Sequence, residues 1–118
     1  MAEDKPILRL FVSQPMANKS DEEIFDERWG AMQKVQAARP DRYVVLIESY
    51  LSETVEGVNP PLWYLGASLQ LMSKADVAYF AEGWNQARGC KVEFECAEAY
   101  GVPMVFYDEF MDNERDGE

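Results

Sequence analysis

The sequence predicts an α/β domain built on a small parallel sheet, and three observations lead to this prediction. Short apolar runs of strand length alternate with longer stretches that have helical periodicity. Pro and Gly residues separate the two kinds of segment. The chain has 118 residues, of which 47% are hydrophobic and 28% are charged, which is the balance of one folded domain. We therefore expect a single domain over residues 1–118.

The first strand and the first helix are predicted from residue types and capping. Residues 7–13 (ILRLFVS) are rich in branched and aromatic side chains, as in a buried strand. Ser20 with Glu23 three residues later forms a capping box, which predicts the start of a helix over residues 20–38. The residues that recur at helical spacing along it are Ile24, Arg28, Ala31, Met32 and Val35.

The rest of the chain repeats this alternation. We expect strands at residues 43–48 (YVVLIE), 76–81 (DVAYFA) and 103–107 (PMVFY). Between them, helical spacing predicts helices at residues 61–74 and 91–100. In the first of these helices one stripe consists of Leu62, Leu65, Leu69 and Met72. In the second, the predicted core stripe consists of Val92, Cys96 and Ala99.

Four strands joined by helices predict a flavodoxin-like or Rossmann-like three-layer sandwich. Right-handed crossovers give a parallel sheet of four to five strands in the order 2-1-3-4. The order reverses between strands 1 and 3, where ligands bind beyond the carboxyl ends of the strands. The loops at that point, residues 13–20 and 82–89, offer Ser13, Gln14, Glu82, Trp84, Asn85, Arg88 and Gly89. Alternatively, these loops are polar only because they are loops, and Trp84 packs in the core.

Charge and cysteine content exclude several classes of function. The net charge of -11 opposes binding to duplex nucleic acid or to an anionic membrane. The chain has no His and only Cys90 and Cys96, which excludes a His-containing triad and a zinc set of four Cys and His ligands. No long apolar run or signal segment is visible, so we expect a cytoplasmic protein without a membrane partner. Residues 109–118 are expected to form a frayed acidic tail.

Glu93 is the sharpest candidate for chemistry. The exposed face of its helix is predicted to carry Lys91, Glu95 and Glu98. Glu93 instead shares a line with small and aromatic residues in the first turn, facing the point where the strand order reverses. A carboxylate in that place can act as a nucleophile. The alternative is that Glu93 only favours the start of the helix.

Several segments together resemble the nucleoside 2-deoxyribosyltransferase and deoxynucleotide N-glycosidase superfamily. The residues that match its signature are Gly89, Glu93, Ala97, Ala99, Gly101 and Pro103. The segment LFVSQPM resembles the family's opening strand and loop, and KADV resembles its entry into the third strand. SQPM, WYLG, ADVAYF and RGC resemble a phage and prophage branch of it more closely. The resemblance covers residues 7–107.

This resemblance implies an N-glycosidase or deoxyribosyltransferase that acts on a nucleoside or nucleotide. Glu93 is then the nucleophile, and no metal or organic cofactor is needed. The implied substrate-binding residues are Ser13, Gln14, Pro15, Met16, Ser68, Glu82, Trp84, Arg88 and Gly89. Trp84, Trp63 or Tyr64 would stack on the base. Relatives complete their sites across subunits, so a homodimer or a higher homo-oligomer is expected, with residues 60–64 as an interface.

Two positions depart from the family's pattern. Ser68 stands where the family has an Asp that positions the sugar and serves as acid or base. Phe11 stands where the transferases have a Tyr that orients the nucleophile. Either another group, such as Glu82, replaces the Asp, or the chain binds a nucleotide without turning it over. A structural or interaction protein is the third alternative.

Overall fold

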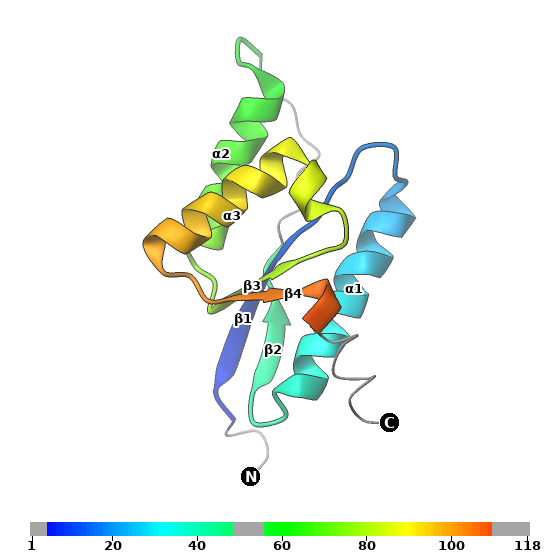
Figure 1. The fold of residues 1–118 in the computed structure, drawn as a ribbon, viewed down its shortest axis with the longest axis vertical. Coiled ribbons are helices and arrows are strands. Elements are labelled where there is room, and N and C mark those ends of the chain that lie inside the picture. Colours follow the sequence, from blue (N-terminus) through cyan, green and yellow to red (C-terminus); the bar gives the residue numbers. More distant parts are fainter. Residues whose placement is uncertain (1–4, 49–55, 110–118) are drawn as a thin grey trace.

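A computed structural model of the protein describes residues 5–48 and 56–109. Within these residues a four-stranded sheet has the order β2-β1-β3-β4, with helices on both faces (Figure 1). Each pair of neighbouring strands is parallel. The elements, in chain order, are β1 (Ile7–Ser13), α1 (Asp21–Ala38), β2 (Tyr43–Leu46), α2 (Pro60–Met72), β3 (Val77–Phe80), the 3₁₀ helix η2 (Trp84–Gln86), α3 (Arg88–Tyr100) and β4 (Met104–Phe106). The predicted α/β class, parallel sheet and strand order are confirmed.

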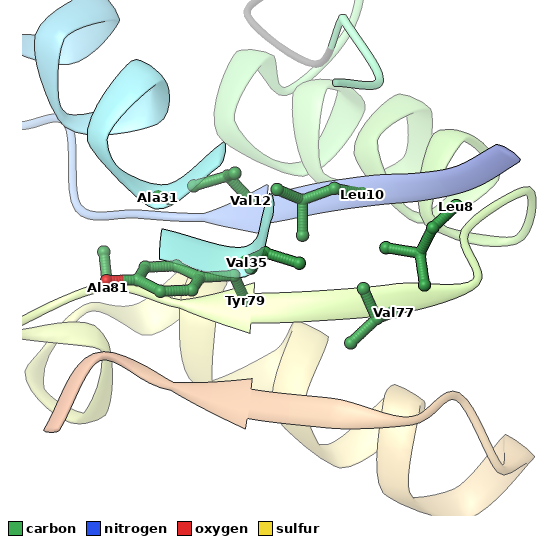
Figure 2. Close-up of a cluster of buried hydrophobic side chains, with 8 residues drawn as sticks. All are labelled: Leu8, Leu10, Val12, Ala31, Val35, Val77, Tyr79 and Ala81. Atoms are coloured by element: carbon green, nitrogen blue, oxygen red, sulfur yellow. The ribbon is translucent and has the colours of Figure 1, made fainter. Parts of the chain in front are cut away.

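Each face of the sheet has its own apolar core, because alternate side chains of a strand point to opposite faces. One face packs against α1, as Figure 2 shows, and this cluster consists of Leu8, Leu10, Val12, Ala31, Val35, Val77, Tyr79 and Ala81. The other face packs against α2 and α3, through Phe11, Ala78, Phe80, Met72 and Ala97. The two clusters give the fold its three layers.

The helix α1 begins where the sequence predicts and is fixed to the sheet by a buried cation. The Ser20 hydroxyl accepts a hydrogen bond from the Glu23 amide at 3.1 Å, and the Glu23 carboxylate accepts one from the Ser20 amide at 2.8 Å. Arg28 is only 1% exposed. Its guanidinium donates to the Ile47 carbonyl at 2.9 Å and to the Glu48 carboxylate at 3.1 Å. These contacts join α1 to the chain that leaves β2.

Several element bounds differ from those predicted. The strand β2 ends at Leu46, two residues earlier than expected. The helix α2 begins at Pro60 because the Asn59 side chain caps it, accepting a hydrogen bond from the Leu62 amide at 3.1 Å. The helix α3 begins at Arg88, three residues before its predicted start. These shifts leave the order of the elements unchanged.

The predicted core stripe of α3 is wrong. Ala99 is exposed, and Val92 is only half-buried. The buried residues of this helix are Cys90, Glu93 and Ala97. The prediction kept Glu93 out of the core because it is a carboxylate. Hydrogen bonds from two serine hydroxyls allow it to be buried. Ala97, at 0% exposed, packs against the sheet with its small side chain and lets the helix approach closely.

The turn after β3 contacts the loop after β1. Gly83 has φ of 88°, a conformation that favours glycine. A Cβ atom at this position would lie 3.3 Å from Cγ of Pro15. The two loops that the sequence places at the reversal of strand order are therefore in steric contact.

Some predictions fall outside the described residues. The expected acidic tail, apart from Glu109, and residues 49–55 of the expected long loop are not described. Among the helices that are described, none combines the length and the apolar character needed to cross a bilayer.

Candidate functional site

A cavity of about 300 Å³ lies beyond the carboxyl end of β1. Its walls come from the loop after β1, from one side of α2 and from the start of α3. The lining residues are Gln14, Pro15, Met16, Pro61, Tyr64, Leu65, Ser68, Ala87, Gly89, Cys90 and Glu93. Because β1 and β3 are neighbours and the strand order reverses between them, the cavity lies at the edge where such sheets bind ligands.

The Glu93 carboxylate is held by hydroxyl groups from two other elements. It is 7% exposed and lines the cavity from the first turns of α3. Ser13, at the end of β1, donates its hydroxyl to Oε1 at 2.5 Å. Ser68, on α2, donates its hydroxyl to Oε2 at 2.6 Å. Three elements that are distant in sequence therefore fix the orientation of one carboxylate.

Burial raises the pKa of Glu93 above its ordinary value, because the charged form loses hydration. The hydrogen bonds from Ser13 and Ser68 oppose this shift, since they stabilise the carboxylate, but burial dominates. Within the described residues, no Lys or Arg forms an ion pair with this carboxylate. Glu93 is therefore a desolvated carboxylate whose described partners are neutral, beside a space large enough for a small ligand.

The Gln14 side chain lines the same cavity and is held by hydrogen bonds to α1. It is 6% exposed, and its Nε2 donates to the Glu27 carboxylate at 2.7 Å and to the Ile24 carbonyl at 3.3 Å. Lys19 forms an ion pair with Glu27 at 3.1 Å. Both partners of Nε2 are acceptors, so the amide orientation is determined. Its buried Oε1 has no hydrogen-bond donor among the described residues.

Cys90 is a cavity residue that sequence reasoning missed. It is 4% exposed and precedes Glu93 by three positions, which places both on one face of α3. Burial raises the pKa of its thiol to about 11, although a hydrogen bond with Ser13 opposes the shift. The thiol therefore stays protonated near neutral pH. The spacing to Glu93 was a usable signal, but the prediction placed the core on a different stripe.

The structure brings most of the predicted site residues together. Gln14, Pro15, Met16, Ser68, Gly89 and Glu93 line the cavity. Ser13 contacts the site through its bond to Glu93. Glu82 and Arg88 are exposed and do not line the cavity.

Trp84 also lies away from the cavity. The centroid of its ring is 4.9 Å from that of the Phe94 ring, and 5.5 Å from those of the Phe80 and Phe106 rings. These contacts match the alternative interpretation, in which Trp84 packs in the core. The aromatic ring that does line the cavity is Tyr64, which packs edge-on against Trp63 at 5.2 Å.

Comparisons with known proteins extend the description of the fold. A scan against protein-family models found no match, and a search of curated proteins found none either. The chain is similar to the crystal structure of a conserved protein from Enterococcus faecalis V583, with a TM-score of 0.58 and 13% identity. The match covers 85% of this chain and 62% of the Enterococcus faecalis protein. This chain therefore spans less than two thirds of the length of that protein. At this identity the likeness concerns the fold alone.

Proposed function

We propose that the protein cleaves or transfers the N-glycosidic bond of a nucleoside or nucleotide, with Glu93 as the nucleophile. The observation that carries this proposal is the Glu93 carboxylate, buried beside the cavity with each oxygen held by a serine hydroxyl. The resemblance of the surrounding sequence to nucleoside 2-deoxyribosyltransferases supports the same assignment. No metal or organic cofactor takes part.

The proposed reaction has two steps at the anomeric carbon of the sugar. Glu93 attacks this carbon, the bond to the base breaks, and the electron pair of that bond moves to the base nitrogen. Water or a second base then attacks the same carbon and releases the carboxylate. Two inversions give net retention, as in retaining glycosidases. Ser13 and Ser68 are positioning residues, because they hold the carboxylate at a fixed angle to the cavity.

The substitution Glu93→Gln tests this proposal. It keeps the shape and much of the hydrogen bonding but removes the attacking charge, so base release should fall by at least about 10³-fold. Glu95→Gln is the matched control, because Glu95 is exposed on the same helix. Chromatography of free base, after incubation with deoxynucleosides, ribonucleosides and their 5'-monophosphates, measures the effect. Base release that persists undiminished in Glu93→Gln would exclude the mechanism.

A nucleotide-binding module without chemistry is the second candidate, and Ser68 favours it. This hydroxyl stands where the resembling family has a carboxylic acid, and among the described lining residues Glu93 is the only carboxyl group. In that case ligands should raise the melting temperature without releasing base. Glu93→Gln should then change the affinity only modestly.

We also propose that the protein forms a homodimer or a higher homo-oligomer. The expected interface, residues 60–64, carries exposed apolar side chains in the single chain, with Leu62 65% exposed and Trp63 37% exposed. Burying such a patch between copies is favourable. Light scattering at micromolar concentration should give at least twice the chain mass of 13.5 kDa. A strictly monomeric mass would contradict this prediction.

A further inference from the structure

When Glu93 is ionised, its buried negative charge has no counter-ion in the described part of the chain. No Lys or Arg of that part lines the cavity, and residues 49–55, which precede α2, contain neither residue type. Lys19 is engaged by Glu27, and Arg88 is exposed outside the lining. Buried charges are normally paired, because an unpaired ion loses its hydration without compensation. A ligand that brings a positive charge would supply the missing partner for Glu93.

The other lining groups also suit a cation. Gln14 lines the cavity with an uncharged side chain, and its buried Oε1 has no hydrogen-bond donor among the described residues. The Tyr64 ring lines the cavity, and the face of an aromatic ring attracts a positive charge. The remaining walls are mainly apolar, so they offer few groups that would compete with Glu93 for a cation. A carboxylate and an aromatic residue therefore line the same cavity.

The same lining is poorly equipped to protonate a leaving base. Glu93 must be ionised to act as the nucleophile, so it cannot also be the acid that protonates the leaving base. Cys90 keeps its proton because burial raises the pKa of its thiol to about 11. Neutral purines and pyrimidines are better leaving groups when an acid protonates them. A base that is already cationic leaves as a neutral molecule and needs no acid.

We propose that the substrate is an N-glycoside with a positively charged base, such as a pyridinium or an N7-alkylated purine. This inference rests on the proposed function and names its substrate class. Glu93 forms a bond to the anomeric carbon while the bond between that carbon and the base breaks. The electron pair of the broken bond moves to the base and neutralises its positive ring. Water then attacks the anomeric carbon, the ester bond to Glu93 breaks, and the proton of the water passes to solvent.

Matched pairs of nucleosides that differ in charge test the proposal. Nicotinamide riboside is compared with its neutral dihydro form, and 7-methylguanosine with guanosine, by chromatography of the released base. We expect kcat/KM to be at least about 100-fold higher for the cationic member of at least one pair. Whichever cationic member reacts faster distinguishes a pyridinium substrate from an alkylpurine substrate.

A binding measurement separates recognition of charge from the greater lability of cationic nucleosides. Calorimetry compares Glu93→Gln with the wild type, at times too early for appreciable turnover. Glu93→Gln should bind the preferred cationic nucleoside at least tenfold more weakly than the wild type does. Its affinity for guanosine should change less than twofold. Equal or faster turnover of the neutral members would overturn the inference and leave the proposed function standing. Absence of base release from every nucleoside would overturn both.

Ser68→Asp gives a second, independent readout. It places a carboxyl group next to Glu93, where it can act as an acid for a neutral base. The ratio of guanosine to 7-methylguanosine turnover should rise at least tenfold relative to the wild type. An unchanged ratio in a folded variant, as judged by circular dichroism, would contradict the inference. If the variant does not fold, the matched pairs with the wild type decide the question.

Discussion

Arg28 and Glu93 are buried charged residues on helices that cover opposite faces of one sheet, but their surroundings differ. Arg28 on α1 is 1% exposed, and its guanidinium contacts the Ile47 carbonyl and the Glu48 carboxylate. Glu93 on α3 is 7% exposed and accepts hydrogen bonds only from neutral hydroxyls among the described residues. The first charge is compensated within the chain, whereas the second is not.

This difference separates a structural role from a functional one. A compensated buried ion holds its helix in place, and Arg28 does so between α1 and the end of β2. An uncompensated buried ion costs stability, and such groups are concentrated at functional sites. Glu93 also borders a cavity of about 300 Å³, whereas Arg28 is not among its lining residues. The buried charge of α1 therefore serves the fold, whereas that of α3 belongs to the candidate site.

Loss of Arg28 should have the largest effect on stability. Arg28→Ala leaves the Ile47 carbonyl without this donor and opens a void beneath α1. We expect the free energy of unfolding to fall by about 3 kcal/mol, since such core truncations belong to the strongly destabilising class. Urea unfolding followed by circular dichroism measures this loss.

Glu48→Gln is the control for Arg28. The Glu48 side chain is 75% exposed, so its ion pair with Arg28 is largely screened by water. The change in the free energy of unfolding should be no more than about 0.5 kcal/mol. A loss as large as that of Arg28→Ala would show that the charge, rather than the buried volume and the carbonyl contact, holds α1 in place.

Glu93→Gln should change the free energy of unfolding less than Arg28→Ala does, and it should stabilise the protein near neutral pH. Because burial raises the pKa of Glu93, the folded state holds this proton more tightly than the unfolded state. Wild-type stability relative to Glu93→Gln should therefore be highest at acid pH. It should decline as the pH rises through the unfolded and then the folded pKa. Near neutral pH we expect Glu93→Gln to be more stable by about 1 kcal/mol.

Melting curves of both proteins between acid and neutral pH test this sign. Glu95→Gln, on the exposed face of the same helix, controls for the general effect of removing a carboxylate. A Glu93→Gln protein that is less stable than the wild type at neutral pH would remove the contrast with Arg28. The serine hydroxyls would then be sufficient partners for the charge.

The fold was predictable because its signals are local. The capping box at Ser20 set the start of α1, and the apolar run 7–13 identified the central strand. Alternation of strands and helices then restricts the topology, because parallel strands require crossovers of fixed hand. The strand order followed from these rules without knowledge of any long-range contact.

The site was only partly predictable because its lining depends on how each helix is rotated. The resemblance in sequence pointed to Glu93, but the burial of its carboxylate depends on Ser13 and Ser68, which are distant in sequence. Tyr64 and Trp84 are both aromatic residues near a predicted loop or helix start, yet only Tyr64 lines the cavity. No periodicity distinguishes these two, because packing among Phe80, Phe94 and Phe106 fixes the orientation of Trp84.

The contact between Gly83 and Pro15 restricts how this cavity can be redesigned. Any side chain at position 83 would need an unfavourable backbone conformation, and its Cβ would press on a proline that forms part of the cavity wall. Libraries that seek new ligand preferences should therefore keep Gly83 and Pro15 constant. Met16 and Leu65 are better positions to randomise, because they line the same cavity from a loop and a helix.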